Sequence, residues 1–264
     1  MAYEFINQTL LDWYPDGWLE EDPYNYNLLT WKNLILTIPG LASAEESIII
    51  SAHLDSTSTS PTVLAPGAED NASGSAALLE AARVLQDHRF NRTFKLIWFS
   101  GEEQGLLGSK AYVADHDISH VLGVVNLDMY GYDADDDGCF EIHVGTLAKS
   151  TEVGQCLVQI IDGYQLPLNN DFLTTSATGA SDHATFWNAG VAAVEILENY
   201  YDNQLPGGCS GNDRNPYYHT TGDTIDKMNL PVGYNITRAA LATAFSMAGD
   251  PPPNYPVFMP IVAR

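Results

Sequence analysis

Residues 93–116 read TFKLIWFSGEEQGLLGSKAYVADH. The stretch Thr93–Ser100 is almost continuously apolar, which is the pattern of a strand buried on both faces of a parallel sheet. Two adjacent acids, Glu102 and Glu103, follow among glycines, and Gly105–His116 then reads as a helix. Buried strands that alternate with helices indicate an α/β fold, so this stretch decides the fold class.

The same alternation continues through the rest of the chain. Further strands are predicted at Asn33–Ile38, Ser47–Ala52, Val121–Leu127, Phe140–Val144 and Val191–Leu197, and further helices at Gly74–His88, Glu152–Asp162 and Pro231–Ala248. A chain of 264 residues is long enough for one large hydrophobic core. We therefore expect a single α/β domain over residues 1–250, with a mixed, mostly parallel central sheet flanked by helices. Residues 251–264 open with three prolines and are predicted to form an extended Pro-rich tail.

The chain is strongly acidic. Thirty-four Asp and Glu residues against eleven Lys and Arg residues give a formal net charge of −23. Such a field repels phosphate backbones and anionic lipid headgroups, so we expect no nucleic-acid partner and no membrane partner. No apolar run approaches the roughly 20 residues that a membrane-spanning helix needs. Solvated surface acids explain most of the excess, and a cation site that gathers carboxylates would explain part of the rest.

Acids and histidines follow the predicted strands at the points where these strands end. Ligands of open α/β sheets bind outside the carboxyl ends of the strands, so we expect these side chains to meet at one rim of the sheet. A further acid stands just before the helix that begins at Gly74. The residues concerned are His53, Asp55, Asp70, Glu102, Glu103, Asp128 and His219.

This set of side chains has the composition of a metal site. Two histidines and at least three carboxylates, without cysteine, are typical ligands of zinc or a similar divalent metal in hydrolytic enzymes. Two metals about 3.5–4 Å apart can hold both the attacking water and the carbonyl oxygen. Glu102 and Glu103 are neighbours in a loop and can point in different directions. One of them can therefore bind metal while the other transfers protons.

Five segments resemble, in the same order, the motifs of the secreted bacterial di-zinc aminopeptidases, whose familiar members are the leucyl aminopeptidases. They are His53–Ser56, Gly67–Gly74, Gly101–Ser109, Asn126–Met129 and Tyr218–Thr224. The resemblance covers most of the chain and implies a zinc-exopeptidase-like fold of the phosphorylase/hydrolase type. It also implies an aminopeptidase that hydrolyses the N-terminal peptide bond through a hydroxide bridging two zinc ions.

The resemblance assigns the metal ligands residue by residue. His53 and Asp128 would hold the first Zn²⁺, Glu103 and His219 the second, and Asp70 would bridge the two ions. A histidine that binds a metal needs an acceptor for its other ring N–H.

The resemblance also assigns the groups around these ligands. Glu102 would be the general base that deprotonates the bridging water and passes the proton to the leaving amine. Tyr218 would donate to the oxyanion of the tetrahedral intermediate. Asp55 and Asp223 would orient the two metal-binding histidines.

The implied substrate is a peptide with a free N-terminus, and the implied enzyme is a secreted monomer. Met1–Glu4 shows no signal-peptide pattern, so we expect any signal peptide to be absent from this chain. Familiar members of the family prefer a bulky apolar first residue in a cleft lined by aromatic side chains. Candidates for that lining are Phe172, Tyr200, Tyr201 and Tyr217.

Other functions remain open at this point. The same scaffold could carry another exopeptidase or dipeptidase, a glutaminyl cyclase, or an inactive binding module. The intact Glu102 and the complete ligand set favour an active two-metal enzyme. Ser181-Asp182-His183 resembles a serine-hydrolase triad only in composition, because triads are defined by geometry and no Gly-x-Ser-x-Gly motif precedes it. We expect it to be a structural loop of the cleft.

The segment Asp133–Gly138 matches the first half of an EF-hand calcium loop. Position 12 of that loop would be Val144, which excludes a true EF-hand. Two interpretations remain: an acidic hairpin turn, or a Ca²⁺ site formed by Asp133, Asp135 and Asp137 with a possible contribution from Glu141.

The three cysteines, Cys139, Cys156 and Cys209, allow at most one disulfide. Some members of the resembled family have a local disulfide in the loop that contains Cys209. No second cysteine is near in this sequence, so that bond is either missing or formed with a distant partner.

Overall fold

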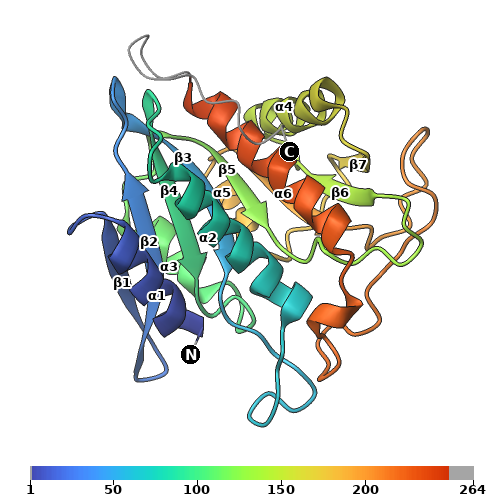
Figure 1. Ribbon diagram of the computed structural model, residues 1–264, viewed down its shortest axis with the longest axis horizontal. Coiled ribbons are helices and arrows are strands. Elements are labelled where there is room, and N and C mark those ends of the chain that lie inside the picture. Colours follow the sequence, from blue (N-terminus) through green and yellow to red (C-terminus); the bar gives the residue numbers. More distant parts are fainter. Residues whose placement is uncertain (1, 250–264) are drawn as a thin grey trace.

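The computed structural model describes residues 2–249, which form a mixed eight-stranded sheet with helices on both faces (Figure 1). The strands are β1 Leu19–Tyr26, β2 Leu29–Ile38, β3 Ser43–His53, β4 Arg92–Phe99, β5 Val121–Leu127, β6 Cys139–His143, β7 Asn169–Leu173 and β8 Ala193–Glu198. The helices are α1 Ala2–Trp13, α2 Ser73–Leu85, α3 Leu107–Asp115, α4 Ala148–Tyr164, α5 His183–Asn188 and α6 Leu230–Ala248, with short helical turns at Ala68–Ala72 and Ile225–Lys227.

The sheet has the strand order β1-β2-β4-β3-β5-β8-β6-β7. Its centre, β4-β3-β5-β8, is parallel, whereas β2 is antiparallel to β4 and β6 is antiparallel to β8. This confirms the predicted α/β domain with a mixed sheet. Because β3, β4 and β5 are adjacent and parallel, their carboxyl ends lie at the same edge.

Both faces of the central strands are buried, as their continuous apolar runs predict. In β4, Leu96 and Trp98 face the core layer under α1, α2, α4 and α6, whereas Ile97 and Phe99 face the smaller layer under α3 and α5. Figure 1 shows α2 and α6 lying across one face of the sheet. Each large apolar side chain that is fully buried contributes about 1.5–3 kcal/mol, so the central strands form a stiff support for the loops at their ends.

Four elements were not predicted from the sequence: α1, β1, β7 and α5. Strand β1 lies at the sheet edge, is mostly polar and contains Pro23, which edge strands tolerate. Strand β7 has five residues and α5 has six, too few for a clear hydrophobic period. Helix α4 begins at Ala148, four residues before the predicted start at Glu152. The predicted Pro-rich tail, residues 251–264, lies outside the described residues.

One disulfide joins Cys139 at the start of β6 to Cys209, 70 residues later, and Cys156 is free. Of the two alternatives left by the sequence, the distant partner is therefore the observed one. Within residues 2–249, no helix has the length and apolar character needed to cross a membrane.

Candidate metal centre

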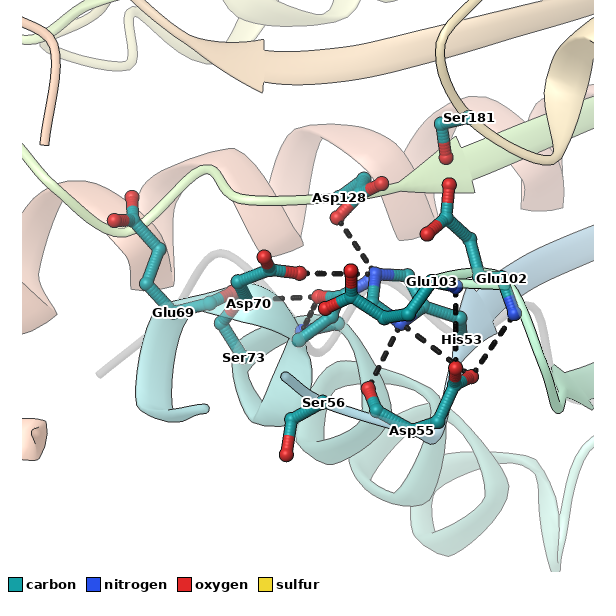
Figure 2. A network of polar contacts seen from close by, with 12 residues as sticks. His53, Asp55, Ser56, Glu69, Asp70, Ser73, Glu102, Glu103, Asp128 and Ser181 are labelled. Carbon is teal, nitrogen blue, oxygen red and sulfur yellow. Dashed lines mark hydrogen bonds and ion pairs between the residues drawn. The ribbon is translucent and has the colours of Figure 1, made fainter. Parts of the chain in front are cut away.

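The predicted metal ligands come together at the carboxyl edge of the central strands. His53 is the last residue of β3, Asp128 directly follows β5, and Glu103 lies in the loop after β4. Asp70 lies in the turn before α2, and His219 comes from the long loop after β8. Figure 2 shows Asp70, Glu103 and Asp128 around the ring of His53.

The five side chains form two groups of three that share Asp70. The Nε2 atom of His53 lies 3.1 Å from Oδ1 of Asp70 and 3.1 Å from Oδ1 of Asp128. The Nε2 atom of His219 lies 3.1 Å from the other oxygen of Asp70, Oδ2, and 3.1 Å from Oε2 of Glu103. Each group can therefore present its three atoms to one cation.

The spacing of these atoms fits zinc. Ligand atoms that are 2.0–2.1 Å from a tetrahedral zinc ion lie about 3.3 Å from one another. The 3.1 Å separations are close to that value. In addition, the Oε1 atom of Glu103 is buried and has no hydrogen-bond partner among the described residues. A buried carboxylate oxygen without a donor is unfavourable unless a cation compensates it, so the donor set suits a pair of divalent metals.

Asp55 connects His53 to the loop that carries the glutamate pair. Its backbone carbonyl lies 3.0 Å from Nδ1 of His53, which leaves Nε2 directed at the cluster. Its carboxylate accepts hydrogen bonds from the backbone N–H groups of Glu102 and Glu103, each 3.2 Å long (Figure 2). The carboxylate itself is 3.8 Å from the ring. The backbone carbonyl of Asp55 therefore orients His53 more closely than the carboxylate that we expected to do so.

Asp223 has a different partner from the expected one. Its carboxylate accepts hydrogen bonds from the backbone N–H groups of Glu69, at 3.2 Å, and Asp70, at 3.1 Å. No hydrogen bond to His219 is found among the described residues. We therefore correct the expectation that Asp223 orients His219. The loop of Asp223 packs against the turn of Asp70, so its carboxylate positions the shared ligand.

Gly74 lets the turn of Asp70 lie close to the end of β5. A Cβ at this position would be 2.6 Å from the carbonyl oxygen of Leu127 and 2.5 Å from Oδ1 of Asn71. The amide of Asn71 also donates to the Leu127 carbonyl, at 2.8 Å. The start of α2 is thereby held against β5, which brings Asp70 next to Asp128.

The cluster is electrostatically strained without cations. Burial, together with the nearby Asp128, raises the pKa of Glu102 to about 10. Burial and the charge of Asp70 raise the pKa of Glu103 to about 7. Burial opposes charge on His53, yet Asp128 and Asp70 raise its pKa well above the ordinary value. Crowded carboxylates of this kind are relieved when they bind metal ions.

A cavity of about 80 Å³ adjoins the cluster. Glu102 and Tyr218, the two predicted catalytic residues, both line it, as do Tyr200 and Tyr201. The ring of Tyr218 stacks on that of His219 at 3.7 Å. Burial raises the pKa of Tyr218 above its ordinary value, so its hydroxyl remains protonated and can donate a hydrogen bond.

Two of the four predicted aromatic residues do not line this cavity. Phe172 packs against the main hydrophobic core, and the ring of Tyr217 lies 5.1 Å from the ammonium of Lys227. Sequence reasoning missed Glu195, which does line the cavity. A signal was present, because Glu195 interrupts the apolar run of β8.

Ser181, Asp182 and His183 do not form a catalytic triad. The Nε2 atom of His183 donates to the backbone carbonyl of Thr178 at 3.0 Å, while Ser181 accepts from the amide of Asn126 at 2.9 Å. Burial lowers the pKa of His183 to about 3, so its ring is neutral. That the three residues form a structural loop of the cleft stays a prediction.

The acidic segment after β5 forms a second, separate group. Asp133 and Asp135 can face a common cation together with Asp213, which the sequence did not suggest. Asp137 is not part of this group and accepts a hydrogen bond from the backbone N–H of Cys139. Glu141 also lies elsewhere. It is fully buried and its carboxylate is 2.8 Å from the ring of His143.

Fold and donor set together are those of an α/β metal-dependent hydrolase. Residues 33–244 match the profile of peptidase family M28, and the chain belongs to that family. It is 31% identical over 230 residues to leucine aminopeptidase 1 of Coccidioides posadasii, covering 82% of this chain and 55% of that protein. It is 32% identical over 213 residues to a probable leucine aminopeptidase of Arthroderma otae, covering 75% of this chain and 52% of that protein. The chain thus spans about half the length of these curated relatives.

Several solved structures are similar to this chain in fold. Legionella pneumophila LapA superposes with a TM-score of 0.73 at 27% identity, covering 94% of this chain and 65% of that one. BSAP, a zinc aminopeptidase from Bacillus subtilis, superposes with a TM-score of 0.64 at 27% identity, covering 84% and 50%. The glutaminyl cyclase of Porphyromonas gingivalis shares the fold alone. It superposes with a TM-score of 0.71 at 17% identity, covering 93% of this chain and 88% of that one.

Proposed function

We propose that this chain is a zinc-dependent aminopeptidase that removes single residues from the N-terminus of peptides with a pair of metal ions. The observation that carries the proposal is the division of Asp70 between two histidine-containing groups, one at each carboxylate oxygen. A single ion would need only one of these groups. His53 and Asp128 would hold one Zn²⁺, His219 and Glu103 the other, and Asp70 would bridge them.

Zinc ions, when bound, polarise the peptide carbonyl and lower the pKa of a bound water from 15.7 to near 7. Glu102 is not needed as a ligand in either group and lines the cavity beside them. Glu102 can therefore accept a proton from the attacking water and pass it to the leaving amine without giving up a metal ligand.

Tyr218 is the proposed hydrogen-bond donor to the oxyanion. Its protonated hydroxyl, at the wall of the cavity beside His219, is suited to a developing negative charge. The acids Asp128 and Glu102 would attract the free amino group of the substrate, which an internal peptide bond lacks. Recognition of that amino group is what makes the proposed enzyme an exopeptidase.

A bulky first residue suits the cavity, in keeping with the apolar preference that the resemblance implies. Met129, Leu197 and the rings of Tyr200 and Tyr201 supply apolar surface. The names of the relatives from Coccidioides posadasii and Arthroderma otae are consistent with such a preference.

We extend the proposal to an exported protein that acts as a monomer. The Cys139–Cys209 disulfide supports export, because such bonds persist mainly in oxidising compartments. Size-exclusion chromatography with light scattering measures the mass in solution, and a mass of two chains or more would contradict the monomer.

The acidic segment supports a second, weaker cation site, for Ca²⁺, at Asp133, Asp135 and Asp213. Aspartates from two loops that are 78–80 residues apart in the chain meet there. Asp213 already accepts hydrogen bonds from the backbone N–H groups of Ala134 and Asp135. These bonds leave less negative charge for an ion, which is why the proposed affinity is low.

The test of the main proposal is hydrolysis of leucine p-nitroanilide beside its N-acetylated form, with and without chelator and added zinc. We expect cleavage of the free-amine substrate alone, loss with chelator and recovery with zinc. Cleavage of dipeptides but not of longer peptides would favour a dipeptidase instead. No cleavage of any substrate by the zinc-loaded protein would favour an inactive binding module.

A further inference from the structure

Glu195 is an acid in the middle of β8, between Val194 and Ile196. It lies in β8, where it pairs with Asn126 of β5 on one side and His143 of β6 on the other. Its side chain is only 3% exposed. A buried carboxylate is costly unless hydrogen bonds or a cation compensate it, so its presence in this strand requires an explanation.

The protein supplies little compensation for this carboxylate. The Oε2 atom of Glu195 has no hydrogen-bond partner among the described residues. The nearest basic group is Nε2 of His183 at 3.5 Å, but that N–H donates to Thr178 at 3.0 Å. The ring of His183 is neutral, because burial holds its pKa at about 3. No full positive charge therefore balances Glu195, and burial together with the nearby acids Asp128 and Glu102 raises the pKa of its carboxyl well above the ordinary value.

Glu195 lines the same cavity as the proposed catalytic groups. Three further acids line it, Asp70, Glu102 and Asp128, and no lysine or arginine of the described chain does. The apolar side chains of Met129 and Leu197 and the tyrosine rings also line it. The cavity thus combines apolar surface with a buried carboxylate that the proposed metal ligands do not include.

We propose that Glu195 determines specificity and favours peptides whose first residue is lysine or arginine. The inference rests on the proposed aminopeptidase function and names the substrate class of that site. The aliphatic stem of a basic side chain would pack on the surface that also suits leucine, and its charged tip would reach Glu195. The resulting charge-assisted hydrogen bond supplies the partner that the carboxylate lacks in the free protein.

The test compares kcat/KM for the p-nitroanilides of lysine, arginine, norleucine and leucine. Norleucine keeps the lysine stem without the ammonium group. We expect the wild type to favour lysine over norleucine, and Glu195→Gln to lower this ratio by about ten- to hundredfold, the range for one hydrogen bond to a charged group. Glu152→Gln, on the exposed side of α4, is the matched control and should leave the ratio unchanged.

A second measurement does not depend on turnover of the basic substrates. Inhibition of leucine p-nitroanilide hydrolysis by free L-lysine and L-norleucine reports the affinities of these two products. Glu195→Gln should weaken the binding of L-lysine and leave that of L-norleucine unchanged. Glu195→Leu should weaken L-lysine binding further and increase the affinity for L-norleucine. If that variant fails to fold, the near-isosteric Glu195→Gln decides the result.

The possible outcomes separate this inference from the proposed function. Cleavage of the leucine substrate with no preference for lysine over norleucine overturns the role of Glu195 alone. An equal lysine-to-norleucine ratio in wild type and Glu195→Gln does the same. If the zinc-loaded protein cleaves none of the four substrates, the proposed function fails and the substrate class fails with it.

Discussion

Asp70 and Asp133 are alike in burial, with 5% and 7% of the residue surface exposed, but differ in what their oxygens do. Both oxygens of Asp70 face histidine nitrogens. One oxygen of Asp133 accepts hydrogen bonds from the backbone N–H of Gly138 and from the side-chain amide of Asn229, which caps the start of α6. The first carboxylate is free to bind a cation, whereas the second is already partly satisfied.

The comparison shows how a fold keeps ligand carboxylates available. Around Asp70, other acids accept the hydrogen bonds that build the loops: Asp223 holds the turn of Asp70, and Asp55 holds the loop of Glu103. At the second group, the aspartates that would face the cation also hold the loops together, as Asp213 does by accepting a hydrogen bond from the backbone of Ala134. We expect strong metal binding at the first group and weak binding at the second.

The largest expected effect comes from Glu102→Gln. Because Glu102 would transfer protons without binding metal, the variant should keep its zinc and lose about 10²–10⁴-fold in turnover, the usual contribution of positioned acid–base catalysis. Steady-state kinetics beside metal analysis measures both quantities. Unchanged turnover would contradict the role of Glu102, and loss of zinc would make it a ligand instead.

Tyr218→Phe should have the next largest effect. It removes one hydroxyl donor from the cavity and leaves the ring that stacks on His219, so turnover should fall by roughly 10²–10³-fold with little change in KM. Tyr217→Phe, outside the cavity, is the neighbouring control. Equal rates for the two variants would remove Tyr218 from the mechanism.

Asp55→Asn tests the supporting acids directly. The backbone carbonyl that orients His53 remains, but one acceptor for the N–H groups of Glu102 and Glu103 is lost. Zinc affinity, measured by competition with a fluorescent chelator, should fall about 10–100-fold. Asp213→Asn, in the group formed with Asp133 and Asp135, should leave zinc affinity unchanged. Equal losses in both variants would mean that general negative charge, and not positioning, holds the metal.

The stability of the metal-free protein should depend on pH through His183, which is fully buried beside Glu195. Burial lowers its folded-state pKa to about 3, below the ordinary 6.5. Between these values the unfolded chain binds the proton and the folded chain does not, so this contribution to stability is present above pH 6.5 and is lost as pH falls toward 3.

Replacing His183 by Gln removes this pH-dependent contribution. The difference in unfolding free energy between wild type and variant should shrink by about 2 kcal/mol from pH 7 to pH 5. Urea denaturation at both pH values measures it, with the exposed His120→Gln as the control for loss of a histidine. A constant difference would mean that His183 takes up a proton in the folded protein.

The smallest expected effect is that of calcium on the acidic segment. Calcium at a concentration of about ten times its dissociation constant would add about 1.4 kcal/mol to the free energy of unfolding. This would raise the melting temperature by about 2–4 °C. Asp213→Asn should abolish this rise, and magnesium should not reproduce it. A melting temperature that calcium leaves unchanged would make the segment an acidic turn only.

Much of the architecture could be read from local patterns. The apolar runs of β3, β4 and β5 predicted buried strands, and the carboxyl ends of neighbouring parallel strands lie at the same edge of the sheet. For that reason the sequence alone predicted that His53, Glu103 and Asp128 lie at a common rim of the sheet. The weak edges of the sheet, β1 and β7, lacked that apolar signal and were missed.

The sequence by itself determined the fold class and which strand ends carry acids and histidines, because apolar periodicity and the residues that interrupt it are local properties. Only the tertiary structure decided the partners of Asp223, 153 residues from Asp70, and the pairing of Cys139 with Cys209. It also decided that Glu195 faces the cavity, through the register of β8 between β5 and β6. These contacts depend on how distant loops and strands pack, and no local pattern encodes that packing.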